Sequence, residues 1–478
     1  MATNTATLAG GQTTISDEAL AEFQAQLRGP ALGAADPAAA QVRPAFNAMH
    51  RGTPALTVSC SGTADVVDAV RFAREHDLAV AVRGGGHSVA GLSSIDGGML
   101  IDLAPMNGVQ VDPERRLVRV QGGAVLGDLD RETQAFGLAT PGGVVSDTGV
   151  AGLTLGGGYG WLRRKYGLSS DNVVEAQVVC ADGEVRTASA DSNPDLFWAI
   201  RGGGGNFGIV TSFTFKLYPL GPIVAFAGTF YPVEEVAEVM RGWRAFVADA
   251  PNEITSVIVN ITFPADPEMP EAVHDRPVTI VGAVYAGDPE EGMPKLQPVR
   301  ELGTPLVDLS QPMPFTAVQA AFDPLFPRDQ MQAYWKSQYL EELSDAAIDV
   351  LASRAQDRPA PLTMVNVFHM GGALRDVGPE ETAFSERSPE FMVSIDGLWT
   401  DPAENDEKIA WVRSTWEEAK QFGTGGVYLN FTGLGDDEAP SAGVDTALGR
   451  NLRRLAEVKA KYDPDNFFRR NNNIAPAN

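Results

Sequence analysis

Residues 83–93 read RGGGHSVAGLS, and they follow the apolar run LAVAV at residues 78–82. A short apolar run predicts a buried strand, which here leads into three glycines and a histidine, His87. Where side chains are missing, backbone N–H groups can approach a phosphate closely. The stretch therefore predicts either an ordinary tight turn or a loop that holds the His87 imidazole beside a bound ligand.

Two further stretches are rich in glycine, PGGVVSDTGVAGLTLGGGYG at 141–160 and RGGGGNFGIV at 201–210. The second contains the spacing G-x-G-x-x-G, but a Rossmann fingerprint must follow a strand and open a helix. Here the helical segment DLFWAI precedes the glycines and the strand-like IVTSFTFKL follows them. We therefore interpret the three loops as wrapping one large, phosphate-bearing ligand together.

The composition is that of a soluble globular protein, with 44% hydrophobic and 21% charged residues in a chain long enough for more than one domain. A net charge of −25 argues against nucleic acid and anionic membranes as partners. We find no secretion signal, no apolar run of membrane-spanning length, and no metal-ligand spacing among the histidines or the two cysteines, Cys60 and Cys180. The sequence predicts a cytoplasmic protein without a metal site.

The chain divides into three parts that differ in composition and in predicted secondary structure. Residues 1–219, with a core at 51–219, read as a glycine-punctuated α+β domain with a helix at 63–77, capped by Thr63, and hairpins at 108–120 and 173–189. Residues 220–425 alternate long strand-like runs with helices, which predicts an antiparallel sheet with helices on one face. Residues 426–478 close the chain with a helix at 448–462 and an asparagine-rich tail.

Five segments carry a family resemblance: RGGGHS (83–88), DTGVAGLTLGGGYG (147–160), DNVVEAQVV (171–179), LFWAIRGGGGNFGIVT (196–211) and KYDPDNFFRRNNNI (461–474). With them the chain resembles the berberine bridge enzyme-like flavoproteins of the vanillyl-alcohol oxidase superfamily, over almost its whole length. The resemblance implies an α+β, two-domain FAD-binding fold of the vanillyl-alcohol oxidase type. In it a PCMH-type domain binds FAD, a helix-covered antiparallel sheet binds the substrate, and residues 426–478 return to the FAD domain.

The resemblance also implies how FAD is held. His87 would be bonded covalently to the 8-methyl carbon of FAD. Many relatives carry a second tether on a cysteine, and Val145 stands at that position here, so we expect a single covalent bond. The other residues expected to line FAD are Arg83, Gly84, Gly85, Gly86, Ser88, Pro141, Gly142, Gly143, Asp147, Thr148, Gly149, Gly152, Gly157, Gly158, Gly160, Gly208, Ile209, Asn471 and Asn473.

The reaction that the resemblance implies is hydride transfer to flavin N5 from a C–H bond next to oxygen or nitrogen in a small organic substrate, with O2 as electron acceptor. A dehydrogenase with another acceptor, or a flavin-binding protein with vestigial activity, are the alternatives. Many relatives use a tyrosine base where this chain has Ala447 and Leu448, which leaves the base open. The catalytic candidates are Tyr428 and Asn430, placed on one face of a strand in VYLNF (427–431), and His369 on a strand expected to face the flavin.

Overall fold

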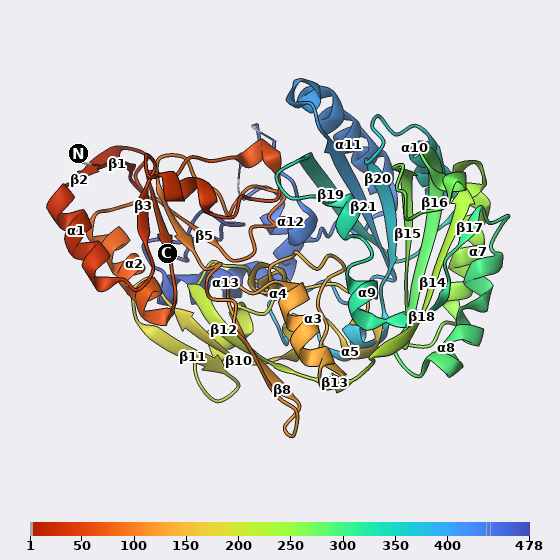
Figure 1. The fold of residues 1–478 in the computed structure, drawn as a ribbon, viewed down its shortest axis with the longest axis horizontal. Coiled ribbons are helices and arrows are strands. Elements are labelled where there is room, and N and C mark those ends of the chain that lie inside the picture. Colours follow the sequence, from red (N-terminus) through yellow and green to blue (C-terminus); the bar gives the residue numbers. More distant parts are fainter. Residues whose placement is uncertain (1–2, 436, 440) are drawn as a thin grey trace.

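The computed structural model describes residues 3–435, 437–439 and 441–478. Two halves lie side by side in it (Figure 1). The half drawn in red to yellow holds the N-terminal domain, and the half drawn in green to light blue is built on one large sheet. The C-terminal segment, drawn in dark blue, lies against the N-terminal half.

The N-terminal half contains a small, mostly parallel sheet in the order β3-β4-β6-β5. Its strands are β3 (Ala31–Gly33), β4 (Leu56–Ser59), β5 (Val80–Arg83) and β6 (Met99–Asp102). Helix α2 (Thr63–Glu75) connects β4 to β5 and buries Val66, Ala69 and Val70. The predicted cap is wrong by one residue: Gly62 caps α2, and the Thr63 hydroxyl instead donates to Gln177 Oε1 at 2.9 Å.

A second sheet of this half is antiparallel, in the order β11-β10-β12-β8-β7. Its strands are β7 (Val109–Asp112), β8 (Leu117–Gln121), β10 (Val173–Val179), β11 (Val185–Ser189) and β12 (Ile209–Lys216). Both predicted hairpins are confirmed, because β7 pairs with β8 and β10 with β11. Helix α6 (Pro194–Ala199) precedes the third glycine loop and β12 follows it, so this loop lacks the strand-to-helix setting of a Rossmann fingerprint.

The large sheet has eight strands, all paired antiparallel, in the order β17-β14-β16-β15-β20-β21-β19 with β18 beside β14. The strands are β14 (Ile223–Pro232), β15 (Ile254–Phe263), β16 (Arg276–Tyr285), β17 (Val307–Asp308), β18 (Gln311–Pro314), β19 (Gln332–Leu340), β20 (Met364–His369) and β21 (Phe391–Trp399). Helices cover its outer face (Figure 1): α7 (Val236–Ala248), α8 (Pro289–Leu296), α10 (Asp345–Gln356) and α11 (Asn405–Ala419). The predicted helix-covered antiparallel sheet is confirmed.

Successive residues of a strand point to opposite faces, and the two faces of this sheet differ in composition. On β20, Val365 and Val367 belong to the apolar core shared with the covering helices. Met364, Asn366 and Phe368 face the N-terminal half. One face is therefore packed with aliphatic side chains, and the other is available to line a site between the halves.

The C-terminal segment contains α12 (Val444–Leu448) and α13 (Leu452–Tyr462). Leu455 and Val458 of α13 are buried in the core of the N-terminal half, together with Phe207 and Trp198. Among the described residues, no helix combines the length and the apolar character that crossing a membrane requires.

Candidate active site

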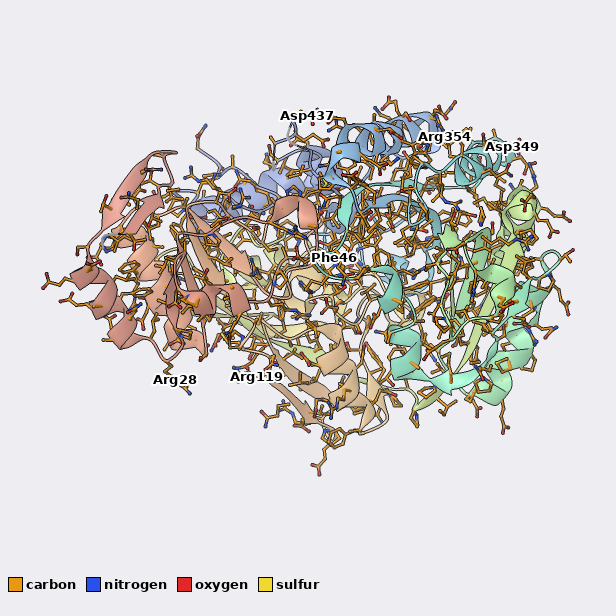
Figure 2. The ribbon with its side chains drawn as sticks, turned by 45° about the horizontal axis from the view of Figure 1, so that its top comes forward. Arg28, Phe46, Arg119, Asp349, Arg354 and Asp437 are labelled. Carbon is orange, nitrogen blue, oxygen red and sulfur yellow. The ribbon has the colours of Figure 1, made fainter. Side chains whose placement is uncertain are left out.

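A cavity of ≈ 310 Å³ lies between the N-terminal half and the large sheet. The three glycine loops and the C-terminal tail contribute one wall, through residues such as Gly85, Thr148, Gly205 and Asn471. Strands β15, β19, β20 and β21 contribute another. Figure 2 shows Phe46 near the middle of the molecule, where the two halves meet.

His87 lines this cavity from the first glycine loop. Its imidazole stacks on the Phe46 ring with 4.2 Å between ring centroids and 10° between planes, and Nε2 is buried without a hydrogen-bond partner among the described residues. Burial, helped by the cations Arg328 and Arg43, lowers the pKa of His87 to about 3. The imidazole is therefore neutral and oriented by stacking, with a free nitrogen.

The first and second glycine loops cross at Gly85 and Gly149, which explains why neither position carries a side chain. A Cβ on Gly85 would come within 2.3 Å of Gly149 Cα, and a Cβ on Gly149 within 2.4 Å of Gly85 N. Both glycines line the cavity. The close approach brings the backbone of both loops to one wall, which side chains at these positions would prevent.

Arg83 and Asp147 were expected to touch the cofactor, and neither is among the residues that line the cavity. Arg83 Nε donates to Ser93 O at 3.2 Å, which ties together the two ends of the first loop. Asp147 Oδ2 accepts from Arg328 Nε at 2.8 Å, and Arg328 also reaches Gly86 O at 3.5 Å. Arg83 therefore holds the first loop closed, and Asp147, through Arg328, links the first and second loops to the second half.

The remaining predicted cofactor residues divide into two groups. Those that line the cavity are Gly84, Gly85, Gly86, His87, Ser88, Gly143, Thr148, Gly149, Gly152, Gly208, Ile209 and Asn471. Those that are not among its lining residues are Pro141, Gly142, Gly157, Gly158, Gly160 and Asn473. Val145, at the position of the second tether in relatives, also lines the cavity.

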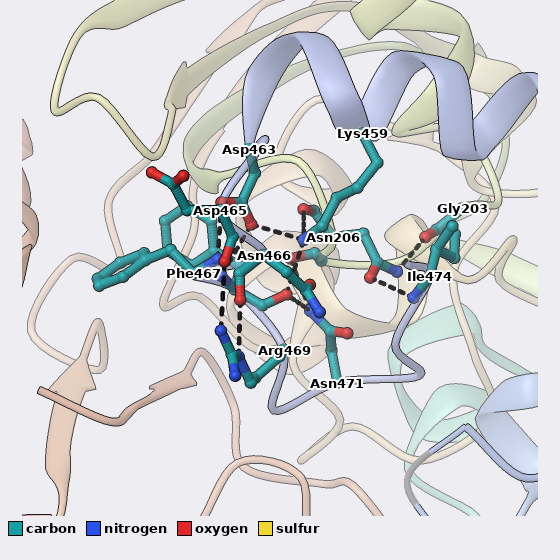
Figure 3. Close-up of polar contacts among 12 residues, drawn as sticks. Gly203, Asn206, Lys459, Asp463, Asp465, Asn466, Phe467, Arg469, Asn471 and Ile474 are labelled. Carbon is teal, nitrogen blue, oxygen red and sulfur yellow. Dashed lines mark hydrogen bonds and ion pairs between the residues drawn. The ribbon is translucent and has the colours of Figure 1, made fainter. Parts of the chain in front are cut away.

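The tail is fastened to the third glycine loop by a buried ion pair that sequence reasoning missed (Figure 3). Lys459 Nζ, which is fully buried, lies 2.6 Å from Asp463 Oδ2 and donates to Asn206 O at 2.7 Å and Phe468 O at 2.9 Å. Asn471 then donates to Gly205 O at 3.1 Å, and its Oδ1 is buried without a partner among the described residues. The spacing K-x-x-x-D on a helix was a visible signal for the Lys459–Asp463 pair.

Tyr428 and Asn430 line the cavity together, although not on a strand as predicted. Leu429–Phe431 form a 3-10 turn (η11) with Tyr428 before it. Asn430 Nδ2 donates to the Tyr428 hydroxyl at 2.8 Å, and Gly158 N donates to the same oxygen at 3.1 Å. Burial raises the pKa of Tyr428 to about 12, against the hydrogen bonds that it accepts, so the phenol stays protonated near neutral pH.

His369 does not reach the cavity, and the expectation that it faces the flavin site is not supported. It follows Phe368 on β20, so its side chain points to the opposite, helix-covered face. There it packs against Trp243, with 6.3 Å between ring centroids, and its Nε2 lies 3.1 Å from Glu390 Oε1. A strand offset by one residue reverses the face of every side chain, and the sequence alone did not fix which residues of β20 face inward.

Asp396 and Asn366 are the site residues that sequence reasoning missed. Both line the cavity and are buried, on the neighbouring strands β21 and β20. Asn366 Nδ2 donates to Asp396 Oδ2 at 2.7 Å, and the Ser394 hydroxyl donates to Oδ1. Burial raises the pKa of Asp396 to about 7, although these two hydrogen bonds oppose the rise. The signal in the sequence was a single acidic residue in the mostly apolar run FMVSIDGLW.

Comparison with known proteins identifies the family. The chain matches the model "FAD binding domain" over residues 54–189 and the model "Berberine and berberine like" over residues 427–475. An FAD-linked oxidoreductase of Dictyostelium discoideum is 34% identical over 429 residues, which cover 89% of each chain. (R)-6-hydroxynicotine oxidase of Paenarthrobacter nicotinovorans is 30% identical, over 90% of this chain and 93% of its own.

The crystal structure of 6-hydroxy-D-nicotine oxidase from Arthrobacter nicotinovorans has the same fold, with a TM-score of 0.83 at 26% identity and coverage of 94% of this chain and 98% of its own. The predicted FAD-binding fold of the vanillyl-alcohol oxidase type is confirmed. The cavity between the halves, with His87 and the glycine loops on one side and Asp396 on the other, therefore lies in a known enzyme architecture. The chain belongs to the berberine bridge enzyme-like family of FAD-linked oxidoreductases.

Proposed function

We propose that the protein is an FAD-dependent oxidase that removes a hydride from a C–H bond next to oxygen or nitrogen in a small organic substrate, with O2 as the electron acceptor. The observation that carries the proposal is one cavity lined by His87 and the glycine loops as well as by Asp396 and Asn366. When bound, FAD supplies the acceptor for the hydride, and O2 takes the two electrons onward with two protons to give H2O2.

The residues of the first wall fit FAD. The loops that cross at Gly85 and Gly149 bring backbone to the cavity surface, as a pyrophosphate requires. His87 Nε2 is a buried nitrogen without a partner, which a covalent bond to the flavin methyl group would satisfy. That bond replaces one N–H and one methyl C–H, so two protons and two electrons leave, and O2 takes them up. With Val145 at the second position, His87 is the single tether.

Asp396 is the proton acceptor in this proposal. An alcohol must lose its hydroxyl proton as the hydride leaves, and an ammonium group must lose a proton first. A base works best when its pKa lies near the working pH, which favours Asp396, with a pKa of about 7, over Tyr428, with a pKa of about 12. Tyr428 instead keeps its proton, and its hydroxyl oxygen accepts from Asn430 Nδ2, which orients the hydroxyl.

A panel of primary amines, alcohols and sugars, mixed anaerobically with the purified holoenzyme, tests the proposal. We expect members of at least one class to bleach the visible flavin absorbance, and air then to restore it within seconds with one H2O2 formed per flavin. Slow recovery in air, with rapid recovery on adding a quinone, would identify a dehydrogenase. If no compound bleaches the flavin, the protein binds flavin without this activity.

A further inference from the structure

The cavity face of the large sheet carries its polar groups in a small, ordered patch. Trp335 on β19 and Met364 on β20 stand directly opposite Asp396 on β21, on either side of it. Asn366 stands opposite Ser394, two residues before Asp396 on the same face. Opposed side chains of neighbouring strands are about 5 Å apart at Cβ, so one ligand can contact Trp335, Asp396 and Asn366 together.

Aromatic rings surround this patch. The four rings Phe326, Trp335, Phe368 and Phe431, here called the aromatic box, all line the cavity. They touch in sequence: Phe326 lies 5.8 Å from Trp335, Trp335 lies 5.6 Å from Phe431, and Phe431 lies 5.9 Å from Phe368, measured between ring centroids. Such walls favour a flat, apolar ring, which gains edge-to-face contacts that a sugar does not make.

Most polar groups near the aromatic box are already engaged within the protein. The Thr432 hydroxyl donates to Tyr428 O at 3.2 Å, and Tyr159 and Tyr339 share a hydrogen bond of 2.5 Å between their hydroxyls. On the sheet side of the cavity, the donor Trp335 Nε1 and the acceptor Asn366 Oδ1 are buried without a partner among the described residues. The ligand that satisfies this wall supplies one acceptor to Trp335 and hydrogens to Asn366 and to the Asp396 carboxylate.

The count of acceptors distinguishes an amine from an alcohol. Asn366 Oδ1 and the Asp396 carboxylate lie on one face and both accept hydrogen bonds. An alcohol has a single hydroxyl hydrogen and can donate to only one of these two groups. A primary ammonium group has enough N–H hydrogens to donate to both, in addition to the bonds that Asp396 already accepts from Asn366 and Ser394. A carboxylate next to a free carbonyl oxygen is also the arrangement that stabilises a cation in a buried site.

Building on the proposed function, we infer that the substrate is a primary arylalkylamine whose ammonium group binds between Asn366 Oδ1 and Asp396 and whose ring carries an oxygen that accepts from the Trp335 indole N–H. Its oxidation removes a hydride from the carbon next to nitrogen, and two N–H protons leave in turn as the ammonium becomes an imine. Water then hydrolyses the imine to an aldehyde and ammonia. The two electrons follow the route already described, to O2.

Three probes test the inference by binding alone, because in each of them the carbon that carries the amine or hydroxyl group has no C–H bond to donate as hydride. They are 4-methoxy-α,α-dimethylbenzylamine, the same compound with a hydroxyl in place of the amine, and the amine without the methoxy group. Calorimetric titration of the holoenzyme gives the three dissociation constants. We expect the alcohol to bind at least tenfold more weakly than the amine, and removal of the methoxy group to weaken binding about fivefold.

Two variants show which residues cause the differences among the three dissociation constants. Trp335→Phe keeps an aromatic ring without the N–H donor and should remove the methoxy effect while the amine preference stays. Asn366→Leu should reduce the amine preference. Trp416→Phe is the matched control, because the Trp416 indole donates to Ser337 O at 3.0 Å from helix α11. It should leave all three constants unchanged.

The outcomes separate this inference from the proposed function. Equal or tighter binding of the alcohol, or a methoxy effect that survives in Trp335→Phe, overturns the inference, even if alcohols or sugars bleach the flavin and the oxidase activity holds. Binding in the expected order, with no amine or alcohol able to bleach the flavin, supports the inferred ligand and rejects the oxidase.

Discussion

The two walls of the cavity are built on different principles. The cofactor wall comes mainly from the three glycine loops, through residues such as 84–88, Thr148, Gly149, Gly204 and Gly205. The substrate wall comes from alternate residues on four strands, such as Val259, Trp335, Asn366 and Asp396. The first depends on where the main chain runs and tolerates little besides glycine at its crossing. The second depends on side-chain chemistry, so it can change without disturbing the fold.

The largest expected effect is at His87, the one side chain of the cofactor wall that we propose is bonded covalently to the flavin. In His87→Ala we expect all of the flavin to be released into the supernatant on acid precipitation, whereas the unaltered protein keeps it in the pellet and yields a peptide bearing the mass of FAD. His274→Ala, at a partly exposed histidine bonded to Met269 O, should retain the flavin. Flavin extractable from the unaltered protein would contradict the tether.

On the substrate wall, Asp396→Asn should have the largest effect. The amide has the same shape but cannot take up a proton, so flavin reduction by the fastest amine or alcohol should slow by about 10²- to 10⁴-fold. Because the base must be ionised, the rate in the unaltered enzyme should rise as pH increases through about 7 and then level off. The variant should lose this rise.

The control for that experiment is Asp130→Asn, which removes a second buried carboxyl whose pKa burial also raises to about 7. Asp130 lies on helix α3 (Leu126–Gln134), away from the cavity lining. Its replacement should change the rate by less than about twofold. If flavin reduction slowed equally in the two variants, the loss would come from replacing any buried carboxyl. Proton transfer to Asp396 would then not be its cause.

The difference between the walls also explains what the sequence could predict. The cofactor wall was visible because its glycines are consecutive, so that each loop forms a motif of its own. The substrate wall was not, because Asn366 and Asp396 are 30 residues apart and become neighbours only through the pairing of β20 with β21. The same pairing decides that Phe368 faces the cavity and His369 does not, and a hydrophobic run such as VNVFHM does not reveal its inward face.

Arg83 and Asp147 show that a residue of a glycine motif need not line the cavity. Their place within glycine motifs suggested contact with the cofactor, but a motif also includes residues that hold its loops in place. Arg83 binds Ser93 O, and Asp147 binds Arg328. A sequence pattern reports that a residue is needed, and only the structure separates contact with the ligand from support of the loop.

The fastening of the cofactor wall can be weakened at Lys459. Lys459→Met leaves Asp463 buried without its cation, and breaking a buried pair in this way costs about 3–5 kcal/mol. We expect faster hydrogen exchange in residues 463–474, measured by mass spectrometry, with the exchange of the large sheet unchanged. Lys461→Met, which removes an exposed ion pair with Asp195, is the matched control and should leave the tail protected.

The junction between the halves should respond to pH through Asp130, which accepts from Gln319 Nε2 at 2.9 Å. Its folded pKa of about 7 lies above the ordinary aspartate value of 3.8. Its contribution to stability is therefore complete at low pH and is lost as pH rises from about 4 to about 7. Asp130→Asn removes this loss and should stabilise the protein above pH 7 by up to about 4 kcal/mol. Melting temperatures from pH 4 to 8, with Glu132→Gln on the same helix as control, measure the effect. A difference that shrinks as pH rises would contradict the assignment.

The smallest effect is expected for a substitution on the helix-covered face of the large sheet, which we expect to be independent of the cavity face. His369 and Phe368 are adjacent on β20, yet His369 packs behind the sheet against Trp243 and Glu390 while Phe368 lines the cavity. His369→Gln keeps a hydrogen-bonding side chain toward Glu390 and leaves intact the backbone carbonyl that Arg163 binds. Flavin reduction should therefore stay within about twofold of the unaltered rate, as for substitutions remote from a site. A tenfold slower flavin reduction with an unchanged melting temperature would contradict this expectation. It would mean that a side chain on the helix-covered face affects the reaction in the cavity.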